Sequence, residues 1–238
     1  MARRIARIAS TVLLALGVLA LVWGFVIWRW GDPVTGVYTR WQQHQLSGEL
    51  AAVERQYQRT AQLVATAQRA STAPRAGTPP VPKLDPKLVA ARARSAAKQL
   101  RTTTSPGKPL GRIRVDRLGL DMIFVDGTDH GSLERGPGAD RRAYLPGEGE
   151  LVYIAGHRTT YGAPFARIDR LKPGDRIELD MPYGQFVYRV SSHVIVPAND
   201  LDRLDSRGHE EIALQACHPR FSARERYIVY ARPLTTMS

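Results

Sequence analysis

The chain has 238 residues, which is enough for one ordinary domain with extensions or for two small domains. Its 34 Lys and Arg residues outnumber its 22 Asp and Glu residues and give a formal net charge of +12. A hydrophobic content of 43% excludes a wholly disordered chain, and a single cysteine, Cys217, excludes an intrachain disulfide and a cysteine-cluster zinc site.

The excess positive charge lies entirely in the N-terminal half of the chain. Residues 1–30 hold four arginines and no acid, residues 31–110 hold 12 basic and 4 acidic residues, and residues 111–238 hold 18 of each. The C-terminal half is therefore formally neutral, which disfavours nucleic acid as its partner.

An uncharged run of 18 residues, Thr11–Trp28, predicts a membrane-spanning helix near the N-terminus. As a helix this run would rise about 27 Å, close to the thickness of the hydrocarbon core of a bilayer. Arginines precede the run, so the positive-inside rule places the N-terminus in the cytoplasm and the rest of the chain outside the cell. We therefore expect a cytoplasmic basic tail at 1–10 and a transmembrane signal-anchor at 11–30.

A cleaved signal peptide is the competing interpretation of this apolar run. Such a peptide needs small residues at its cleavage site, whereas this run ends in the bulky sequence VIWRWGDP. A buried core helix is also disfavoured, because no polar residue interrupts the run to give the helix a solvated face. An uncleaved single-pass anchor in the cell membrane, in contact with the lipid bilayer through residues 11–30, fits best.

An extracellular stalk and linker are expected over residues 31–109. Residues 37–70 are rich in helix formers with a weak apolar stripe, which indicates a helix or a short coiled coil, with a solvated stalk that has no partner as the alternative. Residues 71–88 hold five prolines and predict an extended linker. Residues 89–101 predict one more helix, and residues 102–109 a final linker.

From about residue 110 to residue 238 the sequence consists of short β-type runs separated by Gly- and Pro-rich turns. Eight strands are expected at residues 112–115, 122–125, 151–155, 176–179, 186–191, 194–196, 211–216 and 226–231. So many short strands in one segment indicate an all-β barrel or sandwich.

Cys217 is a candidate nucleophile, because a lone cysteine in an outward-facing protein carries a free thiol. A buried and inert thiol is the alternative. The position of Cys217 argues against it, since the residue ends an apolar strand and precedes a loop that is rich in arginine. Positive charge stabilises a thiolate and lowers the pKa of the thiol.

His157 is the best partner for this thiol among the six histidines. It follows the predicted strand LVYIA and a glycine, so the scaffold would hold it at a strand end that is open to solvent. His218 adjoins the cysteine, but in a continuing strand its side chain would point to the opposite face. The remaining histidines lack a special context: His44, His130, His193 and His209.

Arg226 is the candidate for stabilising an oxyanion. It begins a predicted strand nine residues after Cys217, a separation that suits two adjacent antiparallel strands. Cysteine and arginine would then lie at neighbouring strand ends. Arg220 and Arg224, on the connecting loop, are the competing candidates.

Roughly residues 110–234 resemble the sortases, the cysteine transpeptidases of Gram-positive cell surfaces, and two segments carry this resemblance. These segments are LPGEGELVYIAGHRTTYGAPF and LQACHPRFSARERYIVYA, and they are most similar to class E sortases of actinobacteria. The resemblance implies an eight-stranded β-barrel with a membrane anchor, and a catalytic domain at 110–238. It also implies that His157, Cys217 and Arg226 are the catalytic residues.

In sortases the cysteine attacks the Thr–Gly bond of a C-terminal sorting signal, which is LPXTG-like, or LAXTG-like in class E. The histidine protonates the leaving amine, the arginine stabilises the oxyanion, and an amine of the peptidoglycan precursor resolves the thioester. The resemblance therefore implies two partners, the sorting-signal peptides of secreted proteins and that precursor amine. No metal or cofactor is expected.

One departure from the family pattern precedes the cysteine. Sortases usually have Thr-Leu-x-Thr there, whereas this chain has Ala-Leu-Gln-Ala, so the hydroxyl at Ala216 is missing and the rate is in question. Two alternatives stay open: a non-catalytic barrel that binds surface-protein peptides or wall polymer, and a cysteine hydrolase with water as the acceptor. The sequence does not separate transfer from hydrolysis, because both proceed through the same acyl-enzyme.

Overall fold

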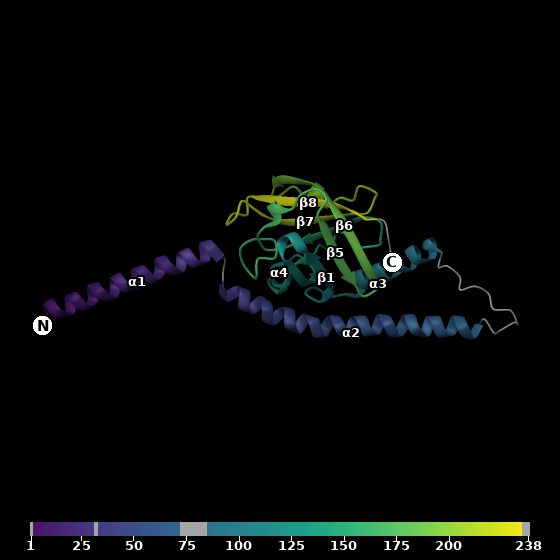
Figure 1. The fold of residues 1–238 in the computed structure, drawn as a ribbon, viewed down its shortest axis with the longest axis horizontal. Helices are drawn as coiled ribbons and strands as arrows, with labels where there is room; N and C mark the ends of the chain where they lie inside the picture. The colour runs from purple at the N-terminus through teal and green to yellow at the C-terminus, as the bar shows by residue number, and fades with distance from the viewer. Residues whose placement is uncertain (1, 31–32, 72–84, 235–238) are drawn as a thin grey trace.

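The computed structural model describes residues 2–30, 33–71 and 85–234, which form three long helices followed by a closed β-barrel (Figure 1). The helices are α1 (Ala2–Trp30), α2 (Pro33–Ser71) and α3 (Pro86–Thr103). The expected eight-stranded all-β barrel, preceded by an apolar helix and further helical segments, is confirmed.

The barrel closes in the order β1-β2-β3-β4-β7-β8-β6-β5. Its strands are β1 (Pro109–Val115), β2 (Leu120–Asp126), β3 (Gly138–Ala139), β4 (Leu151–Ala155), β5 (Arg176–Met181), β6 (Gly184–Pro197), β7 (Glu211–His218) and β8 (Glu225–Pro233). The connections hold a short helix, α4 (His130–Arg135), and three 3-10 helices, η1 (Asp116–Leu118), η2 (Ile168–Arg170) and η3 (Leu201–Leu204).

The structure differs from the predicted strands in two places: two predicted strands are one strand, and one observed strand was not predicted. The number of strands is therefore still eight. The segments expected as separate strands at 186–191 and 194–196 form the single strand β6, which continues through a register shift between Val190 and Ser192. Strand β3 was not predicted, because its two residues, the last glycine of a Gly-Pro-Gly turn signal and the alanine after it, carry no β pattern. Its pairing with both β2 and β4 is needed to close the barrel.

The pairing of three strands fixes where the two ends of the barrel lie. Strands β4 and β7 are parallel, with Leu151 opposite Glu211 and Ala155 opposite Gln215. Strand β8 is antiparallel to β7 and follows it through a short loop. The C-terminal ends of β4 and β7 and the beginning of β8 therefore meet at one end of the barrel.

Large apolar and aromatic side chains fill the barrel. Phe124, Phe165 and Tyr188 are fully buried there, together with the inward-facing aliphatic residues of the strands. Close packing of this kind provides most of the stabilising burial of a small domain and holds the strand ends in fixed positions.

Helix α1 has the length and apolar character that a membrane anchor needs. Within the part of the chain that the structure describes, it is the one helix of this type, with a 24-residue apolar span at Arg3–Val26 that is 0% buried against the protein. This span contains most of the segment predicted as an anchor, 11–30.

Helix α2 confirms the predicted helix at 37–70, but its N-terminal half is not a solvated stalk. Leu46 and Leu50 are buried against Ile123 and Val125 of β2. The amide of Gln43 accepts a hydrogen bond from the Ile123 N–H at 2.7 Å and donates one to the Ile123 carbonyl oxygen at 2.9 Å. The expectation of a free stalk is therefore corrected for this part of the chain, because apolar residues with helical spacing cover an otherwise exposed edge of the barrel.

Helix α3 begins earlier than predicted and also packs on the barrel. The extended linker was expected at 71–88; residues 72–84 lie outside the described residues, but Pro86 already starts the helix. Proline suits a first helical position, and the Asp85 carboxylate caps this end by accepting the Lys87 N–H at 2.9 Å. One face of α3 is buried in the main core through Ala93, Ala97 and Leu100.

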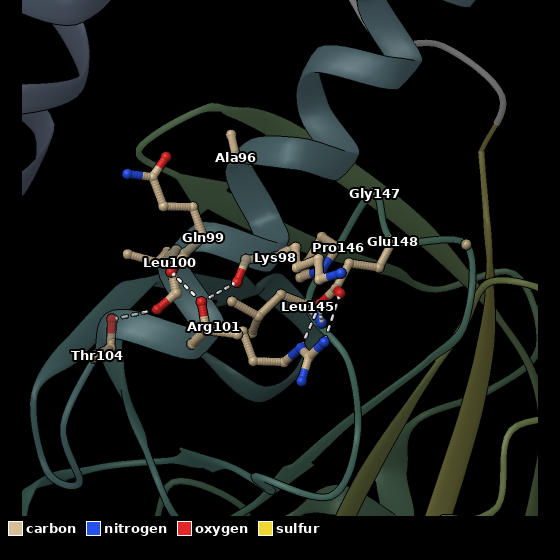
Figure 2. A network of polar contacts seen from close by, with 12 residues as sticks. Ala96, Lys98, Gln99, Leu100, Arg101, Thr104, Leu145, Pro146, Gly147 and Glu148 are labelled. Carbon is tan, nitrogen blue, oxygen red and sulfur yellow. Dashed lines mark hydrogen bonds and ion pairs between the residues drawn. The ribbon is translucent and has the colours of Figure 1, made fainter.

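Polar contacts attach the end of α3 to the loop before β4 (Figure 2). The Arg101 guanidinium donates to both carboxylate oxygens of Glu148, at 2.8 and 2.9 Å. Glu148 also accepts the Leu145 N–H at 2.9 Å. The segment before the barrel is thus joined to it by both apolar and charged contacts.

Candidate active site

A cavity of about 270 Å³ opens at the end of the barrel where β4 and β7 end and β8 begins. Its lining includes the three residues singled out from the sequence: His157, Cys217 and Arg226. They come from three different parts of the chain, and the barrel brings them together. Their placement in one cavity agrees with the expectation; their chemical roles stay a proposal.

Cys217 lies near the end of β7 and is half-buried. Side chains alternate along this strand, so Gln215 and Cys217 line the cavity whereas Ala216 lies in the core with 0% exposure. The residue that departs from the family pattern therefore points away from the cavity.

Arg226 is the direct cross-strand partner of Cys217. Side chains of such pairs lie on the same face of the sheet, with Cβ atoms about 4.5–5.5 Å apart. The Arg226 Nη1 donates to the carbonyl oxygens of Ala223 and Glu225, at 2.9 and 3.1 Å, which holds the guanidinium beside the β7–β8 loop. Arg220 and Arg224 are exposed on that loop and do not line the cavity, so the prediction favouring Arg226 over them fits the geometry.

His157 follows β4 after a single glycine, Gly156. A Cβ atom at Gly156 would lie 2.7 Å from the Phe165 ring, so the chain requires glycine to pass this close to the core. The His157 carbonyl oxygen accepts the Phe165 N–H at 3.1 Å and closes the loop that follows. The glycine thus lets the loop fold back over the core and places His157 at the cavity.

The His157 imidazole is half-buried, and its Nε2 atom has no hydrogen-bond partner within the described structure. Burial lowers the pKa of His157 below its ordinary value; the neighbouring His130 lowers this pKa further, and Glu134 opposes the change. A lowered pKa favours the neutral imidazole at neutral pH, which can accept a proton from a thiol.

The other five histidines all lie in described segments, and none of them lines the cavity: His44, His130, His193, His209 and His218. Strand β7 continues to His218, so the side chains of Cys217 and His218 point to opposite faces of the sheet, as expected. The His218 Nδ1 atom lies 2.8 Å from the Arg158 guanidinium and is thus occupied outside the cavity.

Arg158 is a residue that sequence reasoning missed. It is 5% exposed, and its guanidinium joins the carbonyl oxygen of Cys217, at 3.3 Å, to the carboxylate of Asp169, at 3.1 Å. Arg158, which directly follows His157, therefore connects the His157 loop to the backbone of Cys217. The sequence offered no signal for this contact, because an arginine in a loop is usually exposed.

Tyr161 is the second residue that was missed. Its ring lies 5.1 Å from the His157 ring, measured between centroids, and its hydroxyl donates to the Glu134 carboxylate at 2.8 Å. Its backbone N–H donates to the Thr35 hydroxyl oxygen of α2 at 2.7 Å. This contact spans 126 residues of sequence, so only the fold reveals it.

The cavity gathers the components of an acyl-transfer site: a thiol, an imidazole that favours its neutral form, and a guanidinium with planar donors. Within the described segments no group of three or more His, Cys, Asp or Glu side chains is arranged to hold a metal ion.

Comparison with known proteins gives a consistent result. A family model described as "Sortase domain" matches residues 113–234. Sortase D of Bacillus subtilis (strain 168) is 32% identical over 134 residues, which cover 54% of this chain and 66% of that protein. Sortase SrtE1 of Streptomyces coelicolor is 35% identical over 88 residues, which cover 33% of this chain and 25% of that protein. The chain thus spans slightly less than two thirds of one curated relative and a quarter of the other.

Solved structures share the fold. A sortase D5 transpeptidase of Clostridium perfringens superposes with a TM-score of 0.52 at 23% identity, over 62% of this chain and 99% of that one. The SrtA sortase of Actinomyces oris gives 0.52 at 26% identity, over 56% and 83%. Sortase E1 of Streptomyces coelicolor, with a tripeptide in its active site, gives 0.53 at 24% identity, over 57% and 93%.

Proposed function

The chain belongs to the sortase family, and from that premise we propose that it is a membrane-anchored cysteine transpeptidase with His157, Cys217 and Arg226 as its catalytic residues. The observation that carries the proposal is the single cavity in which the only thiol of the chain lies with these two partners. A barrel that only binds peptides would need neither a cross-strand Cys–Arg pair nor a half-buried imidazole beside it.

The first half-reaction forms a thioester. His157 in its neutral form accepts the Cys217 proton, and the thiolate attacks the threonine carbonyl carbon of an LPXTG-like or LAXTG-like sorting signal. Arg226 stabilises the oxyanion of the tetrahedral intermediate. The C–N bond to glycine then breaks, His157 returns the proton to the leaving amine, and the threonine stays on Cys217 as a thioester.

The second half-reaction transfers the protein to the cell wall. An amine of the peptidoglycan precursor attacks the thioester carbonyl while His157 accepts the amine proton. The carbon–sulfur bond breaks, an amide forms, and the proton returns to the thiol of Cys217. Water in place of the amine would give hydrolysis by the same steps, so the choice of acceptor decides between transferase and hydrolase.

The proposal places the barrel outside the cell, with residues 1–10 in the cytoplasm and residues 11–30 in the membrane. The apolar character of α1 and the arginines in its first turns support this orientation. We assign residues 110–238 as the catalytic domain and residues 31–109 as the extracellular connection. The packing of α2 and α3 on the barrel supports including both helices in the folded catalytic unit.

The experiment uses the full chain in detergent micelles, because removing α2 and α3 would expose core residues of the barrel. The protein is incubated with LPXTG and LAXTG peptides and analysed by intact mass for a thioester on Cys217, and an amine is then added. We expect an adduct that the amine converts to an amide. An adduct that yields only acid would indicate hydrolysis. No adduct with either peptide, in protein whose Cys217 alkylates readily, would overturn the proposal, and Cys217→Ala is the control.

A further inference from the structure

The first turns of α2 contact the loop that follows His157, although this helix belongs to the segment between anchor and barrel. The Thr35 hydroxyl oxygen accepts the Tyr161 N–H at 2.7 Å. One turn later Thr39 is 2% exposed and packs on Gly162, where an added Cβ atom would lie 3.4 Å from the Thr39 methyl group. Two consecutive loop residues are thus held by one face of α2.

Tyr161 transmits this contact to His157. Its ring centroid lies 5.1 Å from that of His157, and its hydroxyl donates to Glu134 of α4 at 2.8 Å. Its backbone has φ +50°, a conformation that non-glycine residues adopt only where their surroundings impose it. The hydrogen bonds that Tyr161 donates to Thr35 and to Glu134 provide such surroundings.

Helix α2 is itself attached firmly enough to position the loop. Gln43 forms two hydrogen bonds with the backbone of Ile123 on β2. The side-chain amide oxygen of Gln42 accepts a hydrogen bond from Arg135 Nε at 3.1 Å, and Leu46 is fully buried against the barrel. The helix therefore provides a fixed reference for Thr35 and not a mobile tether.

We propose that the first two turns of α2 belong to the catalytic apparatus, with Thr35 and Tyr161 as positioning residues that hold the His157 imidazole in the cavity. The proposal rests on the proposed function for its meaning in catalysis. Helix α2 begins at Pro33, only three residues after α1 ends at Trp30. The apolar helix α1 is therefore adjacent in sequence to the helix that orients His157. On this proposal the barrel alone would lack part of its active site.

The His157 titration gives a readout that does not require turnover. Burial is the main reason for the lowered pKa of His157, and the Tyr161 ring provides part of that burial. Loss of the Tyr161 contact admits water, so the pKa of His157 is expected to rise towards the ordinary histidine value. None of the titratable and charged groups that line the cavity or act on this pKa is substituted in the variants: His130 and Glu134 of α4, Asp140, Arg142, Asp200, Cys217 of β7 and Arg226 of β8. Tyr161→Leu and Tyr161→Phe both remove the hydroxyl that donates to Glu134, so the difference between them reports the ring.

The test compares Thr35→Val with Thr60→Val in the full chain in micelles. Both substitutions remove a hydroxyl from α2, but Thr60 is exposed and its hydroxyl donates to the Gln56 carbonyl oxygen of the same helix. We expect Thr35→Val to lower kcat about tenfold or more with KM little changed, because it misplaces an acid–base group and not the peptide. Thr35→Ser should restore activity, and Thr60→Val should behave as wild type.

The second measurement follows His157 by NMR in protein with labelled histidine, with its signal assigned through His157→Gln. Thr35→Val and Tyr161→Leu should both raise the pKa of His157, and Tyr161→Phe, which keeps the ring, should change it less. The proposal is overturned if folded Thr35→Val protein has wild-type kcat and wild-type titration. If the wild type forms no thioester, the proposed function fails, whereas the titration still decides whether α2 positions His157.

Discussion

The two ends of the barrel differ in how completely their polar groups are paired. At the end where β4 and β7 begin, Glu210 accepts the Tyr188 hydroxyl at 2.7 Å and the backbone N–H groups of Gly147 and Gly149 at 3.1 and 3.2 Å. At the same end Glu148 accepts two hydrogen bonds from Arg101 and one from the backbone (Figure 2). These contacts attach α3 and the loop before β4 to the barrel.

The opposite end, where β4 and β7 finish, keeps polar atoms without partners. Among the described residues, His157 Nε2 and Arg158 Nε are buried there and form no hydrogen bond. Glu211 Oε1, a buried atom without a hydrogen bond at the end where β4 and β7 begin, instead has an ion pair with Arg207 at 3.3 Å. The non-glycine residues with φ between +43° and +65° also lie in the loops at this end: Tyr161, Ala163 and Phe221. Unpaired groups and constrained backbone cost stability, so they persist where chemistry needs them. One end of the barrel therefore holds the fold together, and the other end is available for reaction.

The largest expected effect comes from the three cavity residues. Cys217→Ala should abolish thioester formation, and His157→Ala and Arg226→Ala should each lower the acylation rate by about 10²–10⁴-fold, because each removes a group that acts in the transition state. Stopped-flow acylation with a labelled peptide measures the rate, and thermal unfolding should change little. The matched control is Arg224→Ala, which removes an exposed arginine from the loop that precedes β8. An Arg226→Ala protein with wild-type acylation would contradict the assignment.

A substitution at the end where β4 and β7 begin should lower the stability of the protein and leave its activity unchanged. Glu148→Gln keeps the shape of a side chain that is only 6% exposed but removes its charge-assisted bonds to Arg101. We expect the free energy of unfolding to fall by about 1–3 kcal/mol, while kcat and KM of folded protein stay unchanged. Denaturant unfolding in micelles provides the measurement. Asp121→Asn breaks an exposed ion pair with Arg112 and should cost less than about 1 kcal/mol, and an equal loss in both variants would refute the comparison.

Arg158 belongs to the reactive end but acts through the backbone. Arg158→Lys keeps the charge, yet one ammonium group cannot contact the Cys217 carbonyl, His218 and Asp169 together as the guanidinium does. We expect acylation to slow by about tenfold because the strand end that carries the thiol shifts relative to the His157 loop. Arg176→Lys, at an exposed position on β5, is the control and should leave the rate unchanged. Equal rates for the two variants would show that Arg158 has no positioning role.

The sequence predicted those features that short segments encode. Alternating apolar runs gave six of the eight strands in their observed places. The nine-residue spacing predicted Cys217 and Arg226 at neighbouring strand ends, and the structure pairs them directly in the register. Strand β3 was missed because its pairing, and not its two residues, makes it a strand. Arg158, Tyr161 and the docking of α2 were missed because they depend on contacts between segments far apart in the chain.

The smallest expected effect concerns Ala216. Sortases usually have threonine at this position, and the missing hydroxyl put the reaction rate in question. The side chain is 0% exposed in the core, on the face opposite Cys217, so Ala216→Ser should change kcat/KM by less than about threefold. The buried hydroxyl should instead lower the free energy of unfolding by about 1 kcal/mol if it gains no partner. Steady-state kinetics and denaturant unfolding test both. A tenfold gain in kcat/KM would mean that a hydroxyl on the core face of β7 affects the reaction at Cys217. The core face and the cavity face of β7 would then not be functionally separate at this strand end.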